Sequence, residues 1–561
     1  MPLMNEYLNC NFFPVKTYRL AVLVWLLGLC LSIPSFSQNC PPAPVVSPST
    51  QNGFINWKKF PDFTLPFINV YNGPRFGDTE RLPLKKGFSH ITDLTAGDED
   101  KLPKKNRAIV WYGVAYDDRP GKKQPWELIE SPWGMNISIL QEKWSETLTS
   151  FANRFTDTRG KKMPSIDLLV LDIERDRSTT TGILQLKNEA AVPSVYKAMP
   201  DAQFIERYKR DMQKLYTEPL NWLTKQNLDP TTTIGSYSDV PIRNTFINID
   251  GNSWLDWKSN PERVYYTSRD TLSGNVGGSF YNQLDILTPS AYYYYDYPSP
   301  FGGQYLAYLL FQVEANRAWS KKDIVVFEWM RFHDCCQSSL QFIRPFMAEA
   351  SAIFPYFSGA KGIWLWDQNN LSNTQNYSVY EYFINGLYRL SQYKEFFEGT
   401  YQIYIPKSAR DHFEDRDAIW RGVVKGNQIL IAAHNPYAQD GQVTSVPVSF
   451  GSWSTTLQLK GTETFLCKFD LPTQSENIAS LSVTPNPNAG DFEIKYFVRQ
   501  AKAVQLLVHN ALGQEVFAQQ LTAQDGENAQ VFRNTTLNTG LYIVTLKDEQ
   551  QTMQKKFWVV K

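Results

Sequence analysis

The sequence Leu168-Leu169-Val170-Leu171-Asp172-Ile173-Glu174 joins an unbroken apolar run to two acidic residues. Four apolar residues in succession are what a strand buried on both faces of a parallel sheet requires. Side chains two positions apart on a strand share a face, so Asp172 and Glu174 are expected to point the same way. The segment therefore predicts a parallel sheet covered by helices, with two carboxyl groups at its edge.

Comparable apolar segments recur on both sides of this strand, with amphipathic segments between them. The strand candidates are 67–71, 108–116, 166–173, 233–237, 284–294, 324–329 and 362–366. Apolar residues at helical spacing include Trp144 and Leu148, and later Tyr208 and Met212. Seven or eight such units in about 340 residues predict an α/β fold of the (β/α) TIM-barrel type. A doubly wound open sheet is the alternative, weakened by the missing glycine-rich loop.

The pattern changes near residue 400, where short strand-like segments alternate with Gly and Asn turns. Residues 398–472 predict one small all-β sandwich, and residues 477–561 predict a second. In the second, Phe492, Ile494 and Tyr496 recur at the period of two that is typical of strands.

The first residues have the pattern of an export signal. Lys16 and Arg19 precede an apolar run over 20–31, and the small residues Ser35 and Ser37 follow. This order predicts a signal peptide over 1–37 and leaves 38–397 for the barrel, with a buried N-terminal helix as the alternative.

Composition narrows the function classes. The 561 residues hold 56 Lys and Arg against 56 Asp and Glu, so the formal net charge is zero and gives no electrostatic basis for nucleic-acid binding. Apolar residues at 42% and charged residues at 20% favour globular domains over a disordered chain. The aromatic share of 14% is compatible with a carbohydrate partner, because aromatic faces stack on sugar rings as well as filling cores.

Cysteine and histidine form no recognisable ligand set. The four cysteines beyond the predicted signal peptide, Cys40, Cys335, Cys336 and Cys467, are too scattered for a disulfide framework or a zinc site. The five histidines have no HExxH spacing, and GxxxxGK, GxGxxG and GxSxG motifs do not occur. We expect neither a metal nor an organic cofactor.

The carboxyl pair is the first candidate site, because active sites of such barrels gather at the carboxyl ends of the strands. Two carboxyl groups this close do not both ionise readily, so one is expected to keep its proton near neutral pH. A protonated acid beside an ionised one is what glycoside cleavage needs. A solvated acid pair with Arg175 and Arg177 as partners explains the spacing equally well.

Three other strand ends carry side chains that are candidates for binding the substrate. Tyr292 lies in the run Ala291-Tyr292-Tyr293-Tyr294-Tyr295, Glu328 follows an apolar strand, and Trp366 shares a strand face with Trp364 nearer the rim. Each has an ordinary alternative: a tyrosine-rich core strand, a structural salt bridge, and core packing.

Taken in order, these segments resemble the hyaluronidase family and, more distantly, the chitinases. The resemblance runs loosely over residues 60–370, through Pro66-Phe67-Ile68-Asn69-Val70-Tyr71-Asn72-Gly73-Pro74, Asp172-Ile173-Glu174, Gly235-Ser236-Tyr237, Pro289-Ser290-Ala291-Tyr292 and Gly359-Ala360-Lys361-Gly362-Ile363-Trp364-Leu365-Trp366. Ile173 replaces an aromatic residue of the hyaluronidase signature, and Val170 replaces the middle Asp of the chitinase pattern DxxDxDxE.

The resemblance implies a substrate-assisted, retaining mechanism on an N-acetylhexosamine polymer. By analogy, Glu174 is the acid and base and Asp172 orients the substrate's acetamido group. Tyr237, Tyr292 and Trp366 would bind the sugar.

Two rival interpretations remain open. If one early strand has been missed, Glu174 and Glu328 end the fourth and seventh strands, where many retaining glycosidases place their acid and nucleophile. Alternatively, the barrel is a non-catalytic, surface-displayed glycan-binding protein, because a fold does not establish activity.

The C-terminal block from Thr484-Pro485-Asn486-Pro487-Asn488-Ala489-Gly490 to Lys561 resembles the sorting domain of the type IX secretion route. This implies the outer-membrane secretion machinery as a partner, and a protein that is secreted or on the cell surface. An ordinary β-sandwich module is the alternative.

Overall fold

The computed structural model describes residues 40, 46–74, 81–92, 102–243, 246–333, 341–367, 374–451, 453–471, 478–533, 535–548 and 551–561. The predicted signal peptide over 1–37 and the pair Cys335-Cys336 lie outside these residues.

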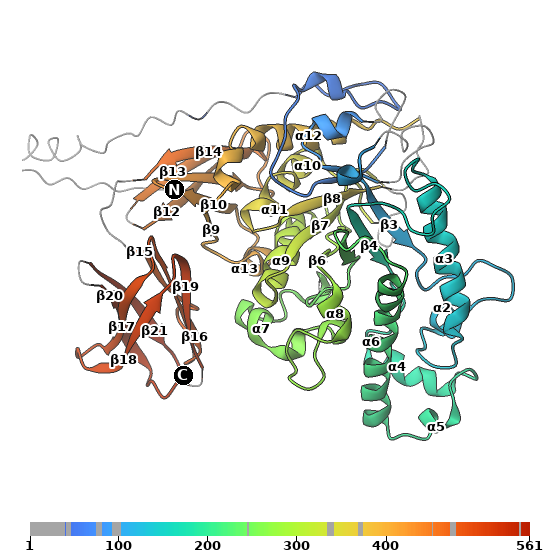
Figure 1. Cartoon of the computed structure of the whole chain (residues 1–561). Coiled ribbons are helices and arrows are strands. Elements are labelled where there is room, and N and C mark those ends of the chain that lie inside the picture. The colour runs from blue at the N-terminus through green and yellow to red at the C-terminus, as the bar shows by residue number, and fades with distance from the viewer. Residues whose placement is uncertain are drawn as a thin grey trace, which may run out of the picture. The chain divides into compact units, whose positions relative to one another are not determined.

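Within the described residues up to 367, eight parallel strands form two sheets (Figure 1). The five-stranded sheet has the order β2–β1–β8–β7–β6, and the three-stranded sheet has the order β3–β4–β5. Their bounds are β1 Val70–Asn72, β2 His90–Ile91, β3 Ala108–Tyr112, β4 Leu168–Asp172, β5 Thr233–Ser236, β6 Ile286–Leu287, β7 Asp323–Trp329 and β8 Gly362–Trp366. Strand β2 is the early strand that the sequence did not reveal.

The strand order follows the chain around the two sheets. Strand β1 pairs with both β2 and β8, and single parallel bridges join Ile91 to Arg107 and Tyr237 to Thr288, beside the ends of the two sheets. The five-stranded sheet lacks the reversal of order that a doubly wound sheet has at its switch point. The α/β class with parallel strands is therefore as expected, and the doubly wound alternative does not fit.

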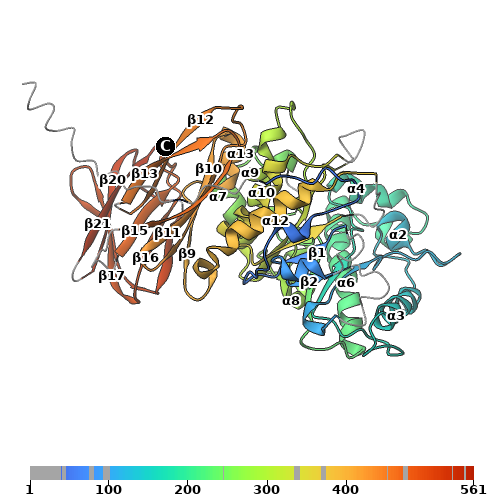
Figure 2. The same cartoon turned by 90° about the horizontal axis from the view of Figure 1, so that it is seen from above.

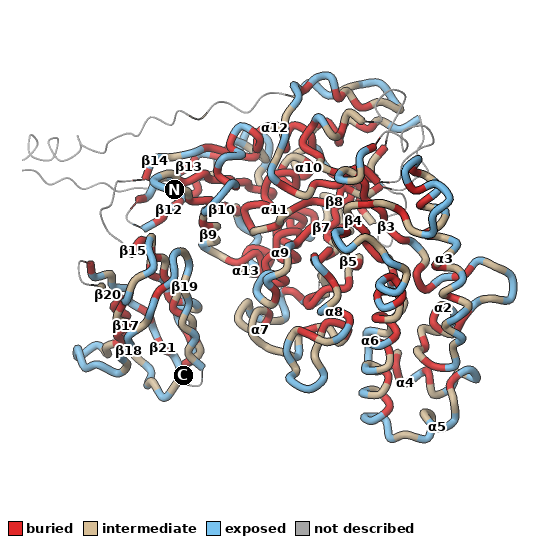
Figure 3. Tube along the Cα trace, viewed as in Figure 1, coloured by how far each residue is buried: buried red, intermediate tan, exposed pale blue. Residues whose placement is uncertain are grey.

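The apolar run on β4 is unbroken because its two faces enter two different cores. Leu168 and Val170 pack among side chains of other strands, including Val110 and Phe327. Leu169 and Leu171 pack against helices on the other face of the sheet. Figure 3 shows β3, β4, β7 and β8 as mostly buried. A strand between two apolar layers cannot alternate apolar with polar residues.

Helices cover the outer faces of the sheets (Figures 1 and 2). Helix α6 is the longest described helix, and Phe204, Tyr208, Met212 and Leu215 on one of its sides are buried, at the spacing that predicted it. In the described residues before 400, the α-helices are α2 Pro125–Ile129, α3 Ile137–Asn153, α4 Thr180–Gln185, α5 Ser194–Lys197, α6 Asp201–Lys225, α7 Trp254–Ser259, α8 Ser279–Gln283, α9 Tyr305–Trp319, α10 Pro345–Ser351, α11 Phe354–Phe357 and α12 Ser378–Ser391.

Beyond α12 the chain is mostly antiparallel strands. One sheet has the order β14–β11–β10–β9, and β12 pairs with β13. The bounds are β9 Gln402–Tyr404, α13 Ala409–Asp415, β10 Ile419–Lys425, β11 Gln428–His434, β12 Val443–Phe450, β13 Trp453–Lys460 and β14 Thr464–Asp470. The two sheets share an apolar cluster around Trp420, Ile431 and Leu457.

The first of these sheets also packs against the parallel-strand region. Val423 and Leu430 belong to the same buried cluster as Leu309 and Phe311 of α9. In the same interface, the buried Arg421 of β10 forms an ion pair with the buried Glu314 of α9, at 2.8 Å from Nη2 to Oε1.

The last strands form two sheets around a core of their own, which contains Phe492, Ile494 and Tyr496. The sheet orders are β15–β16–β19 and β18–β17–β20–β21. The bounds are β15 Ile478–Thr484, β16 Phe492–Val498, β17 Lys502–Asn510, β18 Glu515–Ala523, β19 Gly526–Phe532, β20 Gly540–Lys547 and β21 Thr552–Val559. The period of two in the sequence reflects this one-sided burial.

Cys40 and Cys467 are each disulfide-bonded, which their spacing in the sequence did not predict.

Candidate active site

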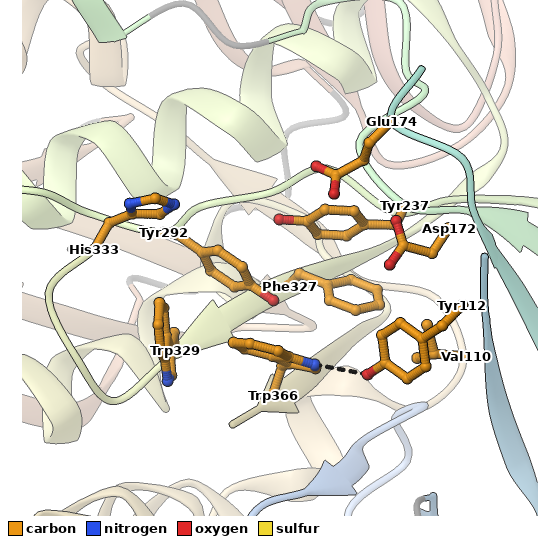
Figure 4. Close-up of a pocket in the computed structure, with 10 residues that line it drawn as sticks. All are labelled: Val110, Tyr112, Asp172, Glu174, Tyr237, Tyr292, Phe327, Trp329, His333 and Trp366. Carbon is orange, nitrogen blue, oxygen red and sulfur yellow. Dashed lines mark hydrogen bonds between the residues drawn. The ribbon is translucent and has the colours of Figure 1, made fainter. Parts of the chain in front are cut away.

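A pocket of about 220 Å³ opens at the carboxyl end of β4 (Figure 4). Asp172, the last residue of β4, and Glu174, two residues beyond it, both line the pocket. The full lining consists of Val110, Tyr112, Asp172, Glu174, Tyr237, Tyr292, Phe327, Trp329, His333 and Trp366. The pair expected from the sequence thus faces one cavity.

The backbone of Glu174 is strained. Its φ is +44°, in the left-handed region that residues with a side chain rarely adopt. Hydrogen bonds on the adjoining residues hold this geometry. The Arg175 N–H donates to the Tyr216 hydroxyl at 3.3 Å, and Trp126 Nε1 donates to the Arg175 carbonyl at 2.9 Å. Strain of this kind persists where the surroundings over-determine the backbone, and it gathers at functional sites.

Asp176 continues this anchoring below the pocket. Its carboxylate accepts hydrogen bonds from Tyr216 at 3.0 Å, from Arg243 at 2.7 Å and from Tyr266 at 2.8 Å, and also from Tyr265. Burial alone would raise the pKa of Asp176, but Arg243 and the phenol donors hold it below its usual value. An ionised, fully bonded carboxylate here fixes the chain just after Glu174.

The carboxyl group of Asp172 is poised to keep a proton. Burial, followed by the neighbouring charges of Glu174 and Asp239, raises the pKa of Asp172 to about 8. Asp239 lies behind the pocket, where Ser236 Oγ donates to it at 2.6 Å, and burial raises its pKa to about 7. The Asp172–Glu174 pair therefore retains a proton at neutral pH, as the sequence predicted.

Aromatic rings form the wall opposite the carboxyl groups. The rings of Tyr292 and Trp366 stack with centroids 5.5 Å apart, and the ring of Tyr237 lies 5.8 Å from that of Tyr292. Tyr237 donates its hydroxyl to Ser290 Oγ at 2.9 Å. Burial raises the pKa of both Tyr237 and Tyr292 well above the usual value, so both phenols stay protonated and able to donate hydrogen bonds.

Of the residues chosen from the sequence, Asp172, Glu174, Tyr237, Tyr292 and Trp366 come together in this pocket, and Glu328 does not.

The placement of Glu328 corrects its assignment as a substrate-binding residue. Phe327 and Trp329 line the pocket, and because strand residues alternate, Glu328 between them faces the helices instead. Its side chain is buried near Tyr305 and Tyr356, and burial raises its pKa well above the usual value. The missed strand β2 does make β4 and β7 the fourth and seventh strands, but Glu328 cannot serve as a nucleophile from this position.

The sequence did not predict Tyr112, Trp329 and His333 in the lining, nor the ring of Phe327. The hydroxyl of Tyr112, the last residue of β3, accepts a hydrogen bond from Trp366 Nε1 at 2.8 Å. Trp329 ends β7, and its Nε1 donates to Asp367 at 2.9 Å. Side chains two positions apart on a strand share a face, so Tyr112 lies on the same face as Val110, and Trp329 on the same face as Phe327. This alternation would have indicated both Tyr112 and Trp329. No sequence signal marks His333, which lies on the loop after β7.

In the described part of the chain, no group of three or more His, Cys, Asp or Glu side chains is arranged to hold a metal ion. None of the helices in those same residues is both long and apolar enough to cross a membrane.

The C-terminal strands match a known family, described as the secretion system C-terminal sorting domain, over residues 482–561. Residues 482–561 are a sorting domain of this kind. The sorting domain accounts for β16–β21 and the last three residues of β15, and directs the chain by type IX secretion to the cell surface or the extracellular space.

No curated protein matches this chain. Among solved structures, bee venom hyaluronidase in complex with a hyaluronic acid tetramer is similar at 16% identity and a TM-score of 0.39, covering 56% of this chain and 94% of that one. The endo-β-1,4-mannanase from Thermotoga petrophila is similar at 10% identity and a TM-score of 0.28, covering 88% of this chain and 89% of that one. Scores this low define neither a shared fold nor an activity.

Proposed function

We propose that the protein is a secreted glycoside hydrolase acting on an N-acetylhexosamine-containing polysaccharide. The observation that carries the proposal is the Asp172–Glu174 pair, which retains a proton and faces a pocket walled by Tyr237, Tyr292 and Trp366. Glycoside cleavage needs such a proton at the leaving oxygen, and flat rings suit the apolar faces of sugars.

In the proposed reaction, the single proton shared by Asp172 and Glu174 passes from Glu174 to the glycosidic oxygen as its bond to the anomeric carbon breaks, which leaves Asp172 ionised. The substrate's own acetamido oxygen attacks that carbon from the opposite side and forms a cyclic intermediate. Water then attacks the same carbon, Glu174 takes the water's proton, and the acetamido group is restored with the configuration retained. No enzyme nucleophile is required, which agrees with the position of Glu328 outside the pocket.

Asp172 and the tyrosines have the supporting roles in this proposal. The carboxyl group of Asp172 would hold the acetamido group in line and stabilise the positive charge that develops on it. The protonated phenol of Tyr292 would donate a hydrogen bond to that group, and Tyr237 would do so by turning its hydroxyl away from Ser290, with Trp366 beneath the ring.

We also propose that the eight parallel strands close into a barrel. The single bridges from Ile91 to Arg107 and from Tyr237 to Thr288 support closure, because they link neighbouring ends of the two sheets. In such a barrel, the carboxyl ends of β4 and β8 meet at one rim, as the pocket requires.

The test measures new reducing ends from hyaluronan, chondroitin, chitin oligomers and peptidoglycan fragments. It compares the chain without residues 1–37 with its Glu174→Gln variant. Losing the general acid and its positioning should lower turnover at least about a thousandfold. Glu142→Gln on the exposed side of α3 is the control and should retain parental activity.

Absence of turnover by the parent on every N-acetylhexosamine polymer would overturn the proposal. If Glu174→Gln then bound glycans as tightly as the parent, the protein would be a glycan-binding protein and not an enzyme.

A further inference from the structure

The pocket is flanked by aromatic side chains that are partly exposed. On one side, Trp366 is hydrogen-bonded to Tyr112, whose side chain is 44% exposed. The chain turns at Gly113, whose φ is +75°. The side chain of Tyr116, which is 41% exposed, folds back against Gly113. Lys123 lies over the ring of Tyr116, 5.6 Å from its centroid.

On the other side, a row of rings leads out of the pocket through His333. The His333 ring is 6.1 Å from the ring of Trp329 and 5.3 Å from the ring of Tyr294. The row continues to Tyr295, 6.4 Å from Tyr294, and to Phe301, 5.2 Å from Tyr295. Phe301 is 40% exposed. Figure 4 shows His333 and Tyr112 on opposite sides of the pocket.

The outer row is supported from beneath. Phe246 lies 5.6 Å from Tyr294, 5.4 Å from Tyr295 and 6.5 Å from Phe301. The Arg416 guanidinium lies over the Phe301 ring at 5.8 Å. Rings fixed in this way lose little conformational entropy when a ligand stacks on them.

We propose that the pocket is the middle of a longer glycan-binding track. Its flanks are Tyr112 and Tyr116 on one side, and Tyr294, Tyr295 and Phe301 on the other. The inference rests on the proposed function and extends it: the occupant is the same polysaccharide, with sugars on both sides of the bond that is cleaved. A track with two flanks binds the interior of a chain, so the enzyme cuts internal bonds.

The polysaccharide is the occupant because the track is continuous with the pocket in which the same polymer would be cleaved. Sugar units repeat along a polymer, and each can place an apolar face on one ring. Cations lie over the outermost ring on each side, Lys123 over Tyr116 and Arg416 over Phe301, so the ends of the track are not the purely apolar patch that the buried core of a protein interface favours.

The test measures binding separately from turnover. In the Glu174→Gln background, calorimetry compares short and long oligosaccharides of chitin and hyaluronan. Phe301→Leu and Tyr116→Leu remove a ring while keeping apolar bulk. Leu272→Ala, at a side chain 96% exposed on another loop, is the control. Phe301→Tyr keeps the ring and should bind as the parent does.

Long oligosaccharides should bind roughly threefold to tenfold more weakly to each Leu variant, the value of one aromatic contact, while short ones bind unchanged. With active protein, the first products from a polymer should be large fragments. If the Leu variants bound long oligosaccharides as tightly as the Glu174→Gln protein does, the track would be overturned and the proposed function would stand. Release of single sugars from a chain end by the active protein would have the same meaning. Failure of every glycan to bind and to be cleaved would overturn both proposals.

Discussion

The carboxyl group of Asp172 is held in a state that costs folding free energy at neutral pH. Its pKa is raised from the ordinary value of 3.8 to about 8 in the folded chain by burial and by Glu174 and Asp239. The folded state therefore binds the proton more tightly than the unfolded state does. The resulting stabilisation is complete below pH 3.8, declines as pH rises, and is gone above about pH 8.

Asp172→Asn should therefore become more stable than the parent as pH rises, because asparagine stays neutral. The difference in Tm between the two proteins, measured by thermal unfolding, should widen from about pH 5 to about pH 8. Asp118→Asn is the control, since Lys143 lowers the pKa of that exposed carboxylate and its removal should bring no such gain. A constant difference across this range would mean that Asp172 titrates normally.

The same proton sets the alkaline limit of the proposed activity. Since the pair delivers its proton to the leaving oxygen, kcat/KM should fall as the pH rises through about 8, the pKa of Asp172. A pH–rate profile on any substrate that the parent cleaves checks this. A rate that stays level to about pH 10 would contradict the role of the pair as the acid.

At the level of single residues, the sequence predicted the site well where one-dimensional periodicity applies. Asp172 and Glu174 face one pocket, as their spacing predicted, although β4 ends at Asp172 and the backbone at Glu174 is left-handed and not extended. The same rule, applied to β7, selects Phe327 and Trp329 and excludes Glu328. Glu328 was chosen for its chemistry instead. His333 depends on the path of a loop, which no local pattern encodes.

At the level of elements, long apolar segments were predictable and short ones were not. Strand β4 has four consecutive apolar residues, whereas β2 has only His90 and Ile91, too few to show a period. Strand β6 covers only Ile286–Leu287, whereas the sequence predicted a strand over 284–294. The tyrosine run that follows is not part of the strand and instead forms a loop beside the pocket. The existence of β2 and the length of β6 both depend on pairing with strands that are distant in the sequence.

The contact between α9 and β10 gives a prediction about stability. Glu314 accepts hydrogen bonds from Arg421 Nε at 3.0 Å and Nη2 at 2.8 Å, from Ser358 Oγ at 2.9 Å and from the Ala409 N–H at 2.7 Å. Glu314→Gln leaves Arg421 buried without its counter-charge and should lower the free energy of unfolding by about 3–5 kcal/mol.

Chemical denaturation measures this loss, and the double variant Glu314→Gln with Arg421→Met should recover much of it. If the single variant unfolds at the parental denaturant concentration, the ion pair contributes nothing to the attachment of the β10 sheet.

At the level of the whole chain, the sorting domain and the region that holds the candidate active site have separate hydrophobic cores. The sorting domain has its own buried cluster around Ile494 and Val544, distinct from the clusters of the parallel-strand region. Deleting residues 478–561 should keep the chain from reaching the cell surface or the medium, because the export machinery reads that domain.

Cell fractionation of the producing bacterium checks this, with the Leu272→Ala chain as an exported control. If the truncated chain reached the medium at the parental level, residues 478–561 would not be required as an export signal.

The left-handed backbone at position 174 has a consequence for the history of such proteins. Glycine or asparagine would relieve the backbone at this position, since both tolerate a positive φ better than glutamate does. Under the proposed function, the need for a carboxyl group is what keeps glutamate there. In a gene copy released from that need, position 174 should drift first, while the packed tyrosines and tryptophans around it persist. The identity of this one residue would then separate working copies from retired ones among otherwise similar genes.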